Sequence, residues 1–170
     1  MKNKDLITII ELVIIIILLI IGITLFFKRS TKKIENIKSF EFIYSSGMEI
    51  YSYVDYKVDC KNNKCIAAIK PSGVPEEKSK TKELTKEELQ ELEDLLKKYK
   101  VERWDGFQKY NRNIMDGSSF NLHINMENNE SIDASGYMKW PKNFKEVSEG
   151  LGKIFKKFYD EGLEEGIEKM

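Results

Sequence analysis

A long apolar run near the start of the chain constrains its fold more than any other feature. The run extends from Leu6 to Phe27 and consists of Ile, Leu, Val and Phe except at four positions, Thr8, Glu11, Gly22 and Thr24. Because an α-helix rises about 1.5 Å per residue, this run would reach roughly 30 Å, the thickness of the hydrocarbon core of a bilayer. The sequence therefore predicts a transmembrane helix over residues 6–27, preceded by a short tail of residues 1–5.

A cleaved signal peptide is the alternative interpretation, since it also begins with positive charge and continues apolar. Cleavage requires small residues in an Ala-x-Ala-like pattern, but the first alanine of this chain is Ala67. No cysteine lies near the end of the run to accept a lipid. We therefore expect an uncleaved, single-pass anchor. Glu11 lies near the N-terminal edge of the run, where it can reach the headgroups, so we assign it no function of its own.

Two cues disagree about the side of the membrane on which the rest of the chain lies. Four basic residues follow the run, at positions 28, 29, 32 and 33, against two before it, at positions 2 and 4. This excess favours a cytoplasmic C-terminal part. The cysteines favour the opposite side, because a disulfide forms in oxidising compartments. We expect an extracytoplasmic domain, and a membrane-tethered cytoplasmic domain remains the alternative.

The chain has two cysteines, Cys60 and Cys65, on either side of an Asn62-Asn63 pair. Asn tolerates the positive φ angles of a two-residue hairpin turn. Such a turn sets Cys60 directly opposite Cys65 and gathers the neighbouring apolar residues on one face. We predict a disulfide between them, with two buried thiols as the alternative. The spacing is neither a C-x-x-C redox motif nor a metal site.

The residues after the run are enough for one domain with one core. We expect a basic neck over residues 28–38, a domain over residues 39–160 and a short acidic tail over residues 161–170. The chain carries 28 basic and 28 acidic side chains. With no excess of positive charge and no basic stripe, it is not expected to bind nucleic acid.

The pattern of the domain predicts an α+β fold of antiparallel β-hairpins packed with two amphipathic helices. Strands are predicted at residues 40–44, 48–60, 65–70 and 120–126, with a return strand in which Ile132 lies opposite Met126. Thr85 and Glu88 form a capping box, which predicts a helix from Lys86. Apolar residues at helical spacing predict a second helix over residues 144–158. Residues 76–83 are expected to be a charged loop.

Catalytic chemistry finds little support in the sequence. The single histidine, His123, lies on the polar side of a predicted strand, and Asp105 and Asp116 each precede a glycine, where Asp shapes turns. No phosphate-binding glycine loop is present. We therefore predict no catalytic residues, no cofactor and no metal, with a thiol-redox or hydrolytic enzyme as the alternative.

A binding module is the favoured class. Tyr51 and Tyr53 lie on the strand face away from the apolar set, and Trp104 and Trp140 lie near predicted loops. These four aromatic residues are a candidate surface for a cell-wall glycan or an envelope protein. The alternative is that a helix covers this face.

Three motifs occur in a fixed order: Trp104-Asp105-Gly106-Phe107, then Asp116-Gly117-Ser118-Ser119-Phe120, then Ser135-Gly136-Tyr137-Met138-Lys139-Trp140-Pro141. In this order, residues 40–158 resemble a group of small bacterial domains of unknown function, often found behind a membrane anchor or a lipoprotein signal. The resemblance implies an α+β extracytoplasmic domain without an assigned reaction.

Overall fold

The computed structural model describes residues 3–28, 32–47, 53–71 and 80–167, and the side chains of residues 10–22, 32–47, 53–70 and 80–158. The chain divides into two compact units, Met1–Lys32 and Lys33–Met170. The second unit begins before residue 39, because Ile34 and Ile37 are buried in its core. The neck predicted over residues 28–38 is therefore partly core.

The first unit contains one helix, α1 (Asn3–Lys28). The large apolar side chains described in it, between Ile10 and Ile21, are 47% to 62% exposed. Judged on the described residues alone, no helix combines the length and the apolar character needed to cross a membrane.

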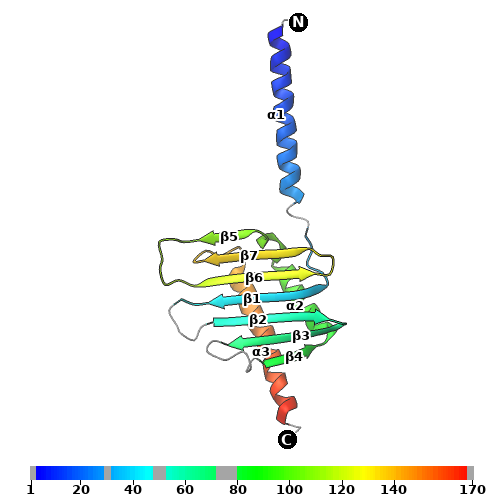
Figure 1. Ribbon diagram of the computed structural model, residues 1–170, viewed down its shortest axis with the longest axis vertical. Helices are drawn as coiled ribbons and strands as arrows, with labels where there is room; N and C mark the ends of the chain where they lie inside the picture. Colours follow the sequence, from blue (N-terminus) through cyan, green and yellow to red (C-terminus); the bar gives the residue numbers. More distant parts are fainter. Residues whose placement is uncertain (1–2, 29–31, 48–52, 72–79, 168–170) are drawn as a thin grey trace. The chain divides into compact units, whose positions relative to one another are not determined.

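The second unit is built on a seven-stranded sheet with the order β4-β3-β2-β1-β6-β7-β5 (Figure 1). All neighbouring strands are antiparallel except β5 and β7, which are parallel. The strands are β1 (Ile37–Ser45), β2 (Tyr53–Lys61), β3 (Lys64–Pro71), β4 (Lys80–Leu84), β5 (Phe107–Tyr110), β6 (Ser119–Met126) and β7 (Ser131–Tyr137).

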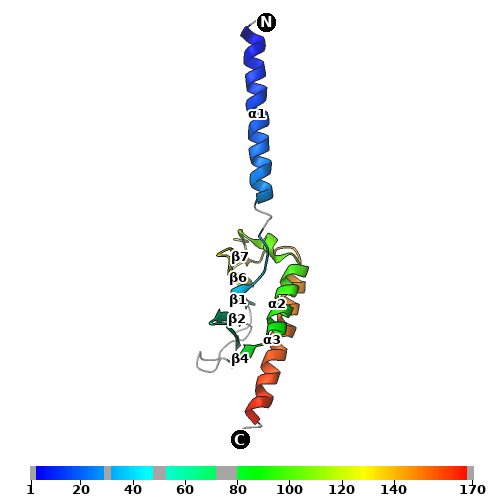
Figure 2. The ribbon, with the colours of Figure 1, turned by 90° about the vertical axis from the view of Figure 1, so that its right-hand side faces the viewer.

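Two long helices, α2 (Lys86–Lys98) and α3 (Phe144–Ile167), lie on the same side of this sheet (Figure 2). A 3-10 helix, η2 (Val101–Trp104), follows α2. The core lies between the helices and the sheet and contains Phe40, Phe42, Phe120 and Phe155, each at most 1% exposed. The predicted α+β class is confirmed.

The local signals of the sequence are reproduced at two places. Thr85 caps α2: its hydroxyl accepts the N–H of Glu88 at 3.2 Å, while the Glu88 carboxylate accepts the N–H of Thr85 at 2.8 Å. Asn62 and Asn63 adopt φ angles of 53° and 63°, and Cys60 pairs with Cys65 in the ladder. The predicted helix start and the register of the β2–β3 hairpin are therefore confirmed.

The register predicted for the β6–β7 hairpin is wrong by two residues. Ile132 lies opposite Ile124 instead of Met126. The turn is tighter than expected, because Asn129 adopts a φ of 62° and the Asn128 side chain accepts the N–H of Glu130 at 2.9 Å. A shift by two keeps the apolar residues on the core face, so the pattern of faces holds.

The structure differs from the sequence-based prediction at both edge strands, β4 and β5, and at the end of α3. No strand was predicted at the position of β5. The segment predicted to be a loop ends in β4, and only Leu84 of that strand is buried. Helix α3 continues to Ile167, so residues 161–167 of the predicted tail are helical. Edge strands make few core contacts, which explains why their sequences lack the usual apolar alternation.

Candidate functional site

The face of the sheet opposite α2 and α3 is the candidate site, and we call it the open face. Within the second unit, neither α2 nor α3 lies on it (Figure 2). Successive residues of a strand point to opposite faces. Because the even-numbered residues of β6 are buried in the core, its odd-numbered residues point to the open face. They are Ser119, Asn121, His123 and Asn125.

One row of charged and polar side chains crosses the open face over four strands. Glu41 of β1 lies directly opposite Lys57 of β2 on one side and His123 of β6 on the other, and His123 lies opposite Asp133 of β7. The Lys57 ammonium lies 2.9 Å from the Glu41 carboxylate, and Nδ1 of His123 lies 2.5 Å from Oδ1 of Asp133. The row therefore consists of two cross-strand pairs.

The hydrogen bonds of Asn125 indicate which ring nitrogen of His123 carries the proton. Its Nδ2 lies 2.8 Å from Nε2 of His123 and donates to the Ser39 hydroxyl at 2.9 Å. An amide nitrogen only donates, so Nε2 must accept and the ring proton lies on Nδ1, which donates to Asp133. In this arrangement Nε2, the nitrogen that would act as a general base, is already hydrogen-bonded.

Asp133 is held by the loop that carries the Trp-Asp-Gly-Phe motif. Its N–H donates to Oδ1 of Asp105 at 3.2 Å, and its carbonyl oxygen accepts the N–H of Gly106 at 2.8 Å. Gly106 has a φ of 70°, a conformation that favours glycine. The hydroxyl of Ser131 donates to Oδ2 of Asp133 at 3.0 Å. Asp105 therefore shapes the turn that joins η2 to β5, as its position before glycine predicted.

Beside this row the open face is hollowed, with a volume of about 270 Å³. The hollow is lined by Glu41, Gln108, Asn121, Leu122, His123, Asp133, Ala134 and Ser135. Within the described part of the chain, the side chains of Gln108, Asn121 and Ser135 make no hydrogen bond. These three groups are available to a ligand.

A buried carboxylate lies on β2 next to the row. Asp55 is 3% exposed, its Oδ2 lies 3.0 Å from the Lys57 ammonium, and its Oδ1 has no hydrogen-bond partner. Hydrogen bonds to Glu41 and Asp55 raise the pKa of Lys57 above its ordinary value. Burial, followed by the negative charge of Asp55, raises the pKa of Tyr53. Lys57 therefore remains an ammonium that bridges the two carboxylates of Glu41 and Asp55.

The structure does not assemble the four predicted aromatic residues into one surface. Tyr51 lies outside the described residues, and Tyr53 is half-buried on the open face. Trp104 is 2% exposed, and its indole N–H donates to the carbonyl oxygen of Lys142 at 3.0 Å. The ring of Trp140, 38% exposed, stacks on Phe144 with centroids 4.5 Å apart.

The prediction that Trp104 belongs to a binding surface is therefore wrong, and Trp140 packs with the core aromatic residues. The stacking of Trp104 on Phe144, with centroids 5.9 Å apart, explains its burial. The position of Trp104 near a predicted loop did not indicate whether its side chain is buried. The residue lies in η2, where its indole is buried.

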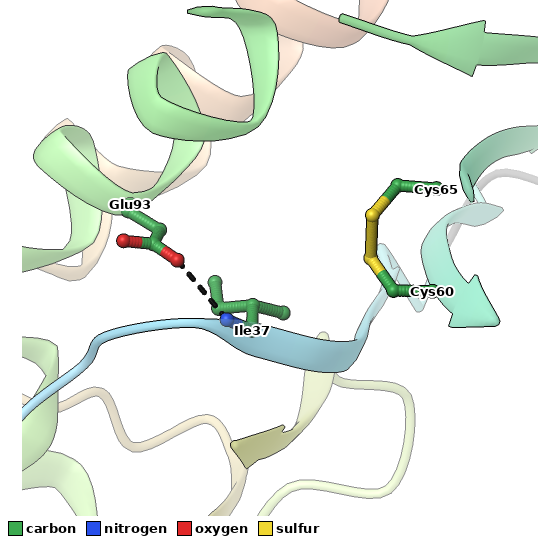
Figure 3. The surroundings of a disulfide bond; sticks show 4 residues. All are labelled: Ile37, Cys60, Cys65 and Glu93. Atoms are coloured by element: carbon green, nitrogen blue, oxygen red, sulfur yellow. Dashed lines mark hydrogen bonds between the residues drawn. A yellow bond between two sulfur atoms is a disulfide. The ribbon is translucent and has the colours of Figure 1, made fainter. Parts of the chain in front are cut away.

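Cys60 and Cys65 form a disulfide near the start of β1 and α2 (Figure 3). The two sulfurs are 2.05 Å apart and both residues pack against the core. Over the residues that the structure describes, no group of three His, Cys, Asp or Glu side chains is arranged to hold a metal ion.

The residues that the sequence-based prediction missed are Gln108, Asn121 and Ser135. Asn121 had a usable signal, since it alternates with core residues of a predicted strand. Gln108 had none, because β5 has only four residues. No protein-family model, curated protein or solved structure matches the chain. The resemblance to small bacterial anchored domains therefore stays a prediction.

Proposed function

We propose that this protein is a single-pass membrane protein whose second unit is an extracytoplasmic binding or envelope accessory domain. The observation that carries the proposal is the apolar surface of α1. From Ile10 to Ile21 every described side chain except Glu11 is apolar, and the large ones are about half exposed. Apolar surface of this extent is favourable in lipid and unfavourable in water.

The disulfide supports the extracytoplasmic side. Disulfides persist in oxidising compartments and are rare in the cytosol, where thiols are kept reduced. Cys60 and Cys65 are the only cysteines of the chain, so no other thiol is present to exchange with them. The basic residues that follow the apolar run favour the opposite orientation, and the experiment below separates the two.

The hydrogen bonds and ion pairs already present on the open face favour binding over catalysis. Both carboxylates that line the hollow already have partners, Lys57 for Glu41 and His123 for Asp133. Nucleophilic catalysis needs a base beside a nucleophile, whereas Nε2 of His123 accepts from Asn125. The unused groups of the hollow are amides and a hydroxyl, which bind and orient ligands.

Two measurements test this proposal. First, the chain is expected to stay with the membrane fraction after alkaline washing. Second, a membrane-impermeant maleimide is expected to label intact cells only after prior reduction. A Cys60→Ser/Cys65→Ser double variant is the control and should give no signal in either state.

Three outcomes would contradict the proposal. Release of the chain into the aqueous phase would show that α1 does not anchor the protein in the membrane. Labelling only after lysis, without any reductant, would place the domain in the cytoplasm. Loss of the first thirty or so residues from the mature chain would favour a cleaved signal peptide.

A further inference from the structure

We infer that the hollow on the open face binds an uncharged, hydroxyl-rich ligand, namely one or two sugar units of a glycan chain. This inference rests on the proposed function, because it names the ligand class of the same face. It is carried by the charge of the hollow, by its three unused polar side chains and by the fixed network at its edge.

The charge of the hollow disfavours anions, and the partners that its carboxylates already have disfavour cations. No Lys or Arg side chain is among the described residues that line it, so an anionic ligand would meet no cation there. The two lining carboxylates are paired with Lys57 and His123, so a cationic ligand would have to compete with partners already present. A neutral polar ligand avoids both costs.

The unused side chains match the hydrogen bonding of sugars. Gln108 lies opposite Ser135, and Ser135 lies opposite Asn121, so these groups form one row across three neighbouring strands. Strands are about 4.8 Å apart, which makes the row roughly 10 Å long. Amides and hydroxyls both donate and accept hydrogen bonds. Sugar hydroxyls do the same, so each side chain of the row can either donate a hydrogen bond to a sugar hydroxyl or accept one from it.

The edge of the hollow is fixed before any ligand arrives. Hydrogen bonds from Asn125 and to Asp133 hold the His123 ring, and Asp105 holds the backbone of Asp133. A site that is ordered in advance loses less conformational entropy on binding. The Glu41 carboxylate can also accept a hydrogen bond from a ligand hydroxyl.

Size and surroundings favour part of a polymer. A volume of about 270 Å³ lies just below the range of roughly 300–1,000 Å³ for pockets that enclose a small molecule. Tyr110 lies two residues after Gln108 on β5, on the same face by strand alternation, and is 65% exposed. The electron-rich face of its ring can stack on the C–H groups of a sugar.

The test uses the full chain in phospholipid nanodiscs, because many detergents carry sugar headgroups. The probe is a β-1,4-linked tetramer of N-acetylglucosamine, titrated by calorimetry. We expect saturable binding with a Kd of about 1 mM or tighter. Asn121→Ala and Gln108→Ala should each weaken it about tenfold, since each removes one hydrogen bond. The matched control is Asp59→Ala, an exposed change on the same face outside the hollow.

Three results would overturn the inference: no saturation by the tetramer, unchanged affinity in both hollow variants, or an equal loss of affinity in Asp59→Ala. Circular dichroism establishes that each variant is folded. The proposed function fails separately, through release of the chain from membranes or labelling from the cytoplasmic side. The tetramer titration is independent of both measurements.

Discussion

The buried carboxylate of Glu93 accepts a hydrogen bond from the backbone N–H of Ile37 at 3.0 Å (Figure 3). Ile37 opens β1, where the ladder with β6 shifts register before Ser39. Helix α2 thus supplies the acceptor that this N–H uses at an irregularity of the sheet. The second oxygen of Glu93 lies 3.0 Å from the Lys97 ammonium, so the buried charge is compensated.

Replacing Glu93 by Leu is expected to lower the free energy of unfolding by about 1–3 kcal/mol, because it leaves the buried N–H of Ile37 without an acceptor. Glu93→Gln keeps an acceptor and should cost less. Urea unfolding measures both values. Asp94→Leu is the matched control on the exposed side of α2 and should stay within about 0.5 kcal/mol of the wild type. Equal losses for Glu93→Gln and Glu93→Leu would contradict this role.

Reduction of the disulfide between Cys60 and Cys65 is expected to destabilise the second unit modestly. The bridge spans a sequence separation of 5, and a loop this short contributes about 2 kcal/mol through the entropy of the unfolded chain. Urea unfolding with and without reductant measures the difference. The Cys60→Ser/Cys65→Ser variant should not respond to reductant. An identical midpoint for the wild type in both conditions would argue against the bridge.

The sequence predicted best where a local rule and the global fold agree. The Thr85–Glu88 capping box and the Asn62-Asn63 turn depend on neighbouring residues only, and both occur as predicted. The alternation of β6 identified its buried face, but not its exact partners, because a slip of two residues keeps every side chain on the same face. Register therefore depended on the turn at Asn128 and Asn129.

The candidate site could be predicted only in part, because it is assembled by pairing between distant strands. His123 and Asn121 were visible on the polar side of one strand. Their partners Asp133 and Gln108 became neighbours only through β7 and the edge strand β5. The depth of Trp104 likewise depends on η2, for which the sequence carried no signal.

Two glycines are expected to respond differently to alanine. A Cβ at Gly136 would lie 2.2 Å from the backbone oxygen of Lys139, which cannot easily move, so Gly136→Ala should cost about 1–3 kcal/mol or more. A Cβ at Gly150 would lie 2.5 Å from the end of the Leu95 side chain, which can rotate. The better helix propensity of alanine, about 1 kcal/mol, offsets this contact.

Thermal unfolding of the two glycine variants measures the difference. Gly136→Ala should lower the Tm clearly, and Gly150→Ala should leave it nearly unchanged. The reverse order would show that α2 and α3 pack too tightly for the Leu95 side chain to adjust.

The pH dependence of stability should report on Glu88. Burial acts to raise its pKa, but the Lys82 ammonium at 2.7 Å and the N–H of Thr85 outweigh burial, so the pKa is lowered. A carboxyl group with a lowered folded-state pKa stabilises the fold above its unfolded value of about 4.3, and this contribution is lost as the pH falls through the folded-state pKa. Unfolding free energies measured from about pH 6 to about pH 3 should therefore fall less steeply in Glu88→Gln than in the wild type. Parallel curves would contradict this linkage.

The hydrogen bonds of His123 predict which ring nitrogen carries the proton. At about pH 8, where an imidazole is neutral, long-range ¹H–¹⁵N correlation spectra should show the proton on Nδ1, because Nε2 accepts from Asn125 and Nδ1 donates to Asp133. Asp133→Ala removes the acceptor and should increase the population of the Nε2–H tautomer. Asp59→Ala should leave the tautomer unchanged. A proton on Nε2 in the wild type would require the Asn125 amide to be reversed, and the edge of the hollow would then present a different set of donors and acceptors.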